Sequence, residues 1–115
     1  MSDKNGNLDD GSYAVVNEDT SHQLTCDVKD TRPAAQISWE IDDARPGSDF
    51  VIGTPSTMIP PDGLIDTTST LTVSKVERKH HRMKAACISE ISVDQKPPAI
   101  TTSVWLDVHG KNYIL

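Results

Sequence analysis

The chain has 115 residues, of which 36% are apolar, and its formal net charge is −6 at pH 7. This length and composition indicate one domain with one modest core. The acidic balance argues against nucleic acid or an anionic membrane as the main partner, because both attract basic surfaces. No apolar run is long enough to span a bilayer, and the first residues are too polar for a signal peptide. If the protein is extracellular, we expect this chain to be an excised fragment with an added start.

The first part of the chain predicts two strands. Residues 1–12 are mostly polar, and we expect them to form a flexible leader or linker. Residues 13–16 are a short apolar run that suits an edge strand. Residues 22–28 alternate between apolar and polar, which is typical of a half-buried strand. The inward side of this strand would hold Leu24, Cys26 and Val28.

A turn and a strand with a tryptophan follow. A proline indicates a turn over residues 30–35, and residues 36–42 alternate again. Residues 50–52 suit a brief strand, whereas the prolines within residues 54–63 exclude a central strand there. The inward residues of the alternating segment would be Ile37, Trp39 and Ile41.

The second half of the chain supplies the remaining strands. Residues 68–73 have high β propensity, and residues 83–91 alternate. Between them, residues 74–82 are basic and suit a short helical turn. The core positions of these two strands would be Leu71, Val73 and Cys87.

Residues 102–108 form the last predicted strand, and residues 110–115 are expected to be a tail or linker. Residues 13–109 would then make up the folded domain. About seven short strands separated by turns, with no convincing helix, are typical of an all-β fold with two packed sheets. We therefore expect a two-sheet antiparallel sandwich.

The chain has two cysteines, Cys26 and Cys87, far apart in sequence. Neither lies near a Cys or His ligand pair, which disfavours a zinc site. Both fall on inward positions of alternating strands, where one bond between them would join two sheets. A disulfide closing so long a loop contributes roughly 4 kcal/mol on the chain-entropy model, and it implies an oxidising compartment.

The order and spacing of Cys26, Trp39 and Cys87 resemble those of an immunoglobulin domain. The resemblance covers residues 13–108, nearly the whole predicted domain. It implies an immunoglobulin-like sandwich with one inter-sheet disulfide and with the indole of Trp39 packed against that bond.

A finer resemblance lies in residues 32–39, Arg-Pro-Ala-Ala-Gln-Ile-Ser-Trp, and in Glu90 followed by a Lys-Pro pair at 96–97. These segments are similar to the second, constant-like domain of nectins, the poliovirus receptor and related adhesion and immune receptors. The chain departs from the wider immunoglobulin pattern at Ala85, where a tyrosine is usual, and at His81, where an aspartate is usual. The resemblance implies a cell-surface module placed between a distal domain and the membrane.

Trp105 is the first candidate contact residue. Strand alternation places it on the outer face of its sheet, and Ile88 and Ala86 on the expected neighbouring strand also point outward. An exposed tryptophan beside Ile and Ala is typical of a protein contact surface. The alternative is that the leader, the tail or an adjacent domain covers Trp105.

The second candidate is a basic segment that holds nearly half of the 11 lysines and arginines of the chain. Its cations are Lys75, Arg78, Lys79, Arg82 and Lys84. His80 and His81 within it add proton-dependent charge. One interpretation is a site for heparan sulfate or another acidic partner. The interpretation we favour is a solvated turn balanced by an acidic loop that contains Asp42, Asp43 and Asp49.

Other kinds of site find little support in the sequence. The two adjacent histidines would point in opposite directions on an extended backbone, so we expect no metal site. No phosphate-binding loop or nucleophile motif occurs, so we expect neither an enzyme nor a cofactor. Residues 30–35, with Arg32, and residues 92–98, with Gln95, are contact candidates only because loops at a sandwich end often make contacts.

These observations predict an extracellular recognition module of a cell-surface adhesion or immune-type receptor, within a membrane-anchored or secreted parent protein. Its expected partner is a cell-surface or secreted protein, with a second copy of itself among the candidates, and a weak glycosaminoglycan contact is also considered. We expect no nucleic acid partner and no membrane insertion of this fragment. The alternative function is a structural spacer in a multi-domain ectodomain, with no ligand of its own. A third alternative, an intracellular scaffold domain, would keep its cysteines reduced.

Overall fold

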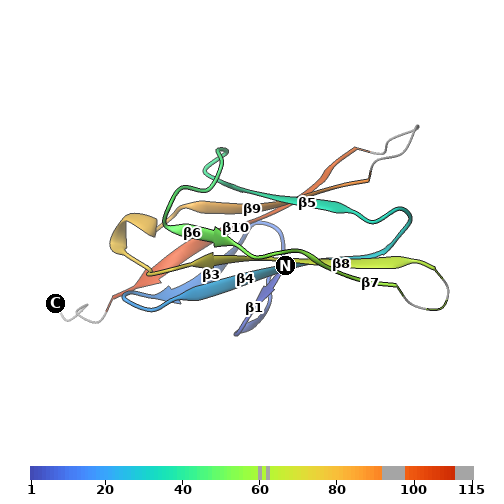
Figure 1. Cartoon of the computed structure of the whole chain (residues 1–115). Coiled ribbons are helices and arrows are strands. Elements are labelled where there is room, and N and C mark those ends of the chain that lie inside the picture. Colours follow the sequence, from blue (N-terminus) through green and yellow to red (C-terminus); the bar gives the residue numbers. More distant parts are fainter. Residues whose placement is uncertain (60, 62, 92–97, 111–115) are drawn as a thin grey trace.

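Two β-sheets pack face to face in the computed structural model, which describes residues 1–59, 61, 63–91 and 98–110 (Figure 1). One sheet has the strand order β2-β1-β4-β8-β6, with β7 also paired to β8, and the other has the order β3-β10-β9-β5. The strands are β1 Ser2–Asp3, β2 Gly6–Asn7, β3 Ser12–Asn17, β4 His22–Thr31, β5 Gln36–Ile41, β6 Phe50–Ile52, β7 Ser56–Met58, β8 Ile65–Val73, β9 Lys84–Glu90 and β10 Ile100–His109. The predicted all-β sandwich is confirmed.

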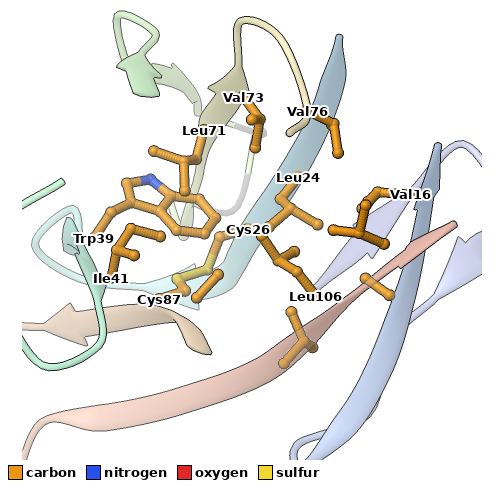
Figure 2. Packing of buried hydrophobic residues seen from close by; sticks show 14 residues of the cluster. Val16, Leu24, Cys26, Trp39, Ile41, Leu71, Val73, Val76, Cys87 and Leu106 are labelled. Carbon is orange, nitrogen blue, oxygen red and sulfur yellow. A yellow bond between two sulfur atoms is a disulfide. The ribbon is translucent and has the colours of Figure 1, made fainter. Parts of the chain in front are cut away.

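A disulfide between Cys26 of β4 and Cys87 of β9 joins the two sheets, with the two Cα atoms 6.4 Å apart. Trp39 of β5 lies directly opposite Cys87 in the strand register, and Figure 2 shows its indole ring beside the disulfide. The indole Nε1–H donates a hydrogen bond of 2.9 Å to Oγ of Ser69 on β8, so the buried polar atom has a partner in the facing sheet. The predicted disulfide and the core position of Trp39 are confirmed.

The period-2 pattern sets which side chains enter the core. Leu71 and Val73 of β8 are fully buried, as predicted, and β3 and β10 contribute inward residues in the same alternating way. The inward residues of β3 and β10 are Ala14, Val16, Val104, Leu106 and Val108. The strand expected over residues 13–16 is an edge strand, and it pairs in parallel with β10.

The N-terminal segment differs from the expected leader, because it forms part of a sheet. β1 and β2 pair as a hairpin, and Ser2 of β1 lies opposite Thr25 of β4. Met1 and Leu8 pack against the core. The carboxylate of Asp3 lies 2.8 Å from Nε2 of His22, and both side chains are buried. This polar pair and the two apolar side chains dock the hairpin, which the polar composition of residues 1–12 did not predict.

A 3-10 turn at Arg78–His80 confirms the short helical turn expected in the basic segment. His80, however, is 0% exposed, so its ring lies in the interior and not on the surface of the basic segment. Its Nδ1 accepts a bond of 2.9 Å from the backbone N–H of Glu77, and its Nε2 donates to Oδ2 of Asp49 at 3.2 Å. Phe50 packs edge-on against the ring, at 5.5 Å between centroids. Both ring nitrogens therefore have partners, which allows the imidazole to be buried.

Asp49 also holds the neighbouring cation of this turn. The ammonium of Lys79 lies 2.9 Å from its carboxylate and, with the bond from His80, keeps the pKa of Asp49 below its usual value. The same contact raises the pKa of Lys79 above its usual value. The group of Asp49, Lys79 and His80 therefore favours the ionised carboxylate and the charged ammonium.

The buried contact of the hairpin leads to a first prediction. Asp3→Ala should lower the free energy of unfolding by about 1–3 kcal/mol, because it leaves the buried imidazole of His22 without its partner. Asp9→Ala removes the same charge from an exposed position of the same segment and should change stability by less than about 0.5 kcal/mol. Urea unfolding of the three proteins measures this difference. Equal stabilities of the two variants would mean that the contact between Asp3 and His22 adds nothing to the stability of the fold.

Acid unfolding tests the Asp49 contact. Its folded-state pKa is lower than in the unfolded chain, so its contribution to stability is present above the unfolded value of 3.8 and is lost as pH falls through the folded value. Asp49→Asn should therefore lower stability at neutral pH and make the loss of stability below about pH 4 less steep. Lys79→Met, which removes the main cause of the shift, should also make this loss less steep. The measurement is the urea midpoint of the parent protein and of both variants from neutral pH into acid. A parallel loss of stability in all three proteins would contradict the prediction.

Candidate protein-binding face

The outer face of the second sheet is centred on Trp105 of β10. In the strand register Trp105 lies opposite Tyr13 of β3 on one side and opposite Lys84 of β9 on the other. Directly opposed residues share one face of a sheet. Trp105 is 37% exposed and Tyr13 is 64% exposed, so two aromatic side chains lie next to each other at the solvent.

The other two residues of the predicted patch contribute less surface than expected. Ile88 is only partly buried, but Ala86 is 3% exposed although it points outward. β9 is a central strand, and the neighbours of Ala86 in the register are Glu40 and Ser103. A methyl group in this position is covered by longer side chains on both sides. The inclusion of Ala86 in an exposed patch is therefore wrong, whereas Trp105 is exposed.

Two further apolar residues of this face were not predicted from the sequence. Tyr13 and Val15 of β3 point outward, opposite Trp105 and Asp107, and Val15 is 42% exposed. Their alternation with the buried Ala14 and Val16 was visible in the sequence. What could not be seen was the parallel pairing that brings β3 against β10. The exposed apolar surface therefore extends toward the sheet edge rather than toward β9.

The turn before β9 closes one side of a hollow on this face. Tyr13, His81, Arg82, Trp105 and Asp107 line a volume of about 560 Å³. The turn is fixed to β10 by its backbone, since the N–H of Arg82 donates to the carbonyl of Leu106 at 2.7 Å. Further along β10, the N–H of Val108 donates to Nδ1 of His81 at 3.0 Å. These bonds place His81 and Arg82 beside the aromatic pair.

Most cations of the basic segment lie against carboxylates. The pairs and their N to O distances are Lys75 with Asp19 at 3.9 Å, Arg78 with Glu18 at 3.5 Å, Lys79 with Asp49 at 2.9 Å and Lys84 with Asp43 at 2.8 Å. The bond from Asp43 raises the pKa of Lys84 above its usual value. Exposed pairs of this kind add little stability, but they neutralise the segment. This supports the interpretation that the acidic loop balances the turn, with Glu18 and Asp19 as further partners.

The remaining candidates are at the opposite end or outside the described residues. Arg32 is exposed, and its guanidinium lies against Gly63. Gln95 and most of the hairpin at 92–98 lie outside the described residues, as do residues 111–115 of the expected tail. Within the described ranges, no group of three or more His, Cys, Asp or Glu side chains is arranged to hold a metal ion. Nor does that part of the chain contain a helix long and apolar enough to cross a membrane.

Comparisons with known proteins identify the domain family. The model of the CD80-like C2-set immunoglobulin domain matches residues 7–99. The crystal structure of Rst D1-D2 is similar, with a TM-score of 0.70 and 17% sequence identity over 93% of this chain and 47% of that chain. The solution structure of Amebosin matches with a TM-score of 0.44 and 9% identity, over 88% of this chain and 91% of that chain. No curated protein matches the chain.

The chain thus spans about half the length of the Rst D1-D2 chain, and at 17% identity that likeness shows the fold alone. The family model covers most of the sequence, and the structure contains the disulfide and the tryptophan that the immunoglobulin resemblance implied. The chain belongs to the C2-set immunoglobulin domains.

Proposed function

We propose that this domain is an extracellular recognition module of a cell-surface adhesion or immune-type receptor, and that it binds a protein partner. Its family and its inter-sheet disulfide support an oxidising, extracellular location, because such bonds persist outside the reducing cytosol. The proposal gives the domain a binding role and no catalytic one.

The observation that carries the proposal is the exposed aromatic pair on the second sheet. Trp105 and Tyr13 lie side by side on a rigid β scaffold, with Val15 next to them along β3. Tryptophan, tyrosine and arginine are the residue types that most often dominate the energy of protein interfaces, and Arg82 completes this set at the hollow. The proposed binding surface is therefore the face formed by Tyr13, Val15, Arg82 and Trp105. We call it the Trp105 face.

A structural spacer remains the second candidate function. The domain family is compatible with it, because an immunoglobulin domain can be one unit of a longer ectodomain. In that case an adjacent domain would cover the Trp105 face, and the isolated domain would bind nothing.

Substitution of the central tryptophan distinguishes the two functions. In a binding screen of the domain against cell-surface ectodomains, itself included, Trp105→Ala should weaken partner binding by about 2 kcal/mol, roughly 30-fold. Since the side chain is partly exposed, the variant should keep its fold and lose no more than about 1 kcal/mol of stability.

Ile52→Ala is the matched control, because it removes an exposed apolar side chain from β6 in the other sheet. It should leave partner binding unchanged. A domain that binds no ectodomain, sediments as a monomer and behaves identically after Trp105→Ala would support the spacer and refute the recognition module.

A further inference from the structure

The hollow on the Trp105 face is walled mainly by hydrogen-bond donors. The indole N–H of Trp105 and the guanidinium of Arg82 can only donate. Because Nδ1 of His81 accepts the backbone N–H of Val108, the proton of the neutral ring lies on Nε2, which is then a donor as well. The hydroxyl of Tyr13 completes the set. None of these side-chain donors has a hydrogen-bond partner among the described residues.

The single carboxylate of the hollow is already engaged. Oδ2 of Asp107 lies 3.0 Å from Nε2 of His109, so one of its two oxygens already has a neighbour. The hollow therefore offers several free donors and a carboxylate held by a neighbouring histidine. A ligand that supplies acceptors fits the donors of Arg82, Trp105 and His81, and it would bind away from the Asp107 carboxylate.

Arg82 differs from the other cations of the basic segment. Lys75, Arg78, Lys79 and Lys84 each have a carboxylate partner, whereas Arg82 has none within the described ranges. Its side chain is exposed and lines the hollow beside Trp105. Among the cations of the basic segment, Arg82 is therefore the exception. Its charge is available to a ligand in the hollow.

The backbone of Arg82 adds a second argument. Its φ is +66°, in the left-handed region that favours glycine, asparagine and aspartate. The other non-glycine residues with positive φ in the described part of the chain are all aspartates: Asp19, Asp30, Asp42 and Asp43. A glycine would occupy this position at lower conformational cost, so the backbone conformation gives no reason for an arginine side chain here. A role in binding does give one.

We propose that the hollow binds a carboxylate of the partner protein, an Asp or Glu flanked by an apolar or aromatic side chain. The carboxylate would be held by Arg82, with His81 Nε2–H as a further donor, and the apolar neighbour would lie on Trp105 and Tyr13. Arginine can bind a carboxylate with two parallel bonds, and exclusion of water by the aromatic rings strengthens such a contact. The inference rests on the proposed function and names the chemistry of its partner.

A sulfated glycosaminoglycan is the competing acidic ligand, and the charge pattern disfavours it. Such chains bind along rows of several uncompensated cations, and here the cations next to Arg82 in sequence are neutralised by their own carboxylates. One cation beside two aromatic rings suits a single carboxylate on an apolar segment.

Two blocked tripeptides, Leu-Glu-Phe and Leu-Gln-Phe, test the inference by NMR on the intact domain. The chain has two tryptophans, so the indole N–H signal of Trp105 reports the hollow, and that of buried Trp39, bonded to Ser69, is an internal control. The Glu peptide at millimolar concentration should shift the Trp105 signal and leave the Trp39 signal unmoved. The Gln peptide should bind at least about fivefold more weakly, because it lacks the charge that Arg82 recognises.

Arg82→Gln keeps the length and hydrogen-bonding capacity of the side chain but removes its charge. It should reduce the affinity for the Glu peptide to that for the Gln peptide. Arg78→Gln is the matched control, since it removes the same charge from the same segment but from a guanidinium engaged with Glu18. This control should bind the Glu peptide like the parent domain.

Each other outcome overturns the inference. Equal affinities for the two peptides, no shift with either peptide, or an unchanged affinity after Arg82→Gln would each show that the hollow does not recognise a carboxylate. A shift of the Trp105 signal by a heparin tetrasaccharide and not by the Glu peptide would assign the hollow to a glycosaminoglycan. In the ectodomain screen, loss of binding by Trp105→Ala but not by Arg82→Gln would refute the carboxylate contact alone. Retained binding by both variants would refute the proposed function itself.

Discussion

The covalent bond between Cys26 and Cys87 is the constraint on which the rest of the structure depends, since it fixes the distance between the two sheets at one point. The two residues are separated by 61 positions, and closing such a loop in the unfolded chain removes roughly 4 kcal/mol of conformational entropy. Trp39 links the sheets a second time, because it belongs to β5 while its indole N–H is bonded to Ser69 of β8. A polar group in the centre of the core is thereby satisfied across the sandwich.

This fixed core also determines the outer faces. A strand has two sides, so a shift of its register by one residue would exchange the buried set for the exposed set. With Val104 and Leu106 buried in the core, Trp105 must lie on the outer face of the sheet. In the same way, burial of Ala14 next to β10 places Tyr13 outside, and the parallel register then brings it opposite Trp105. The Trp105 face thus follows from the packing of the core, and the turn at Arg82 is attached to it by backbone bonds.

The features that could be predicted from the sequence are those that depend on the pattern of residues within single strands. Alternation along each strand was sufficient for the sandwich, the disulfide and the outward direction of Trp105. The features that were missed depend on contacts between distant segments: the docking of the N-terminal hairpin through Asp3 and His22, and the approach of Tyr13 to Trp105. The burial of His80 was not predicted, because the partners of its two ring nitrogens come from the 3-10 turn and from Asp49. Strand alternation correctly predicted that the side chain of Ala86 points outward. It did not predict that this side chain is buried, because its burial depends on residues of the two neighbouring strands.

The net charge of the chain bears on which partner the Trp105 face suits. A charge of −6 repels a second copy of the domain and, at long range, any acidic protein. At physiological ionic strength, however, exposed charges act over only about 8 Å, so the groups next to the contact decide its strength. Near Trp105 the cation without a carboxylate partner among the described residues is Arg82, whereas Arg78, Lys79 and Lys84 each lie against a carboxylate. β3 is an edge strand that presents Tyr13 and Val15 to solvent. Without charge repulsion between copies, its free edge could pair with the same strand of a second copy. For the proposed recognition function, repulsion between two copies of this acidic domain is an argument for a different protein as the partner. Association with an acidic partner would be slow, and the groups next to Arg82 would determine specificity after contact.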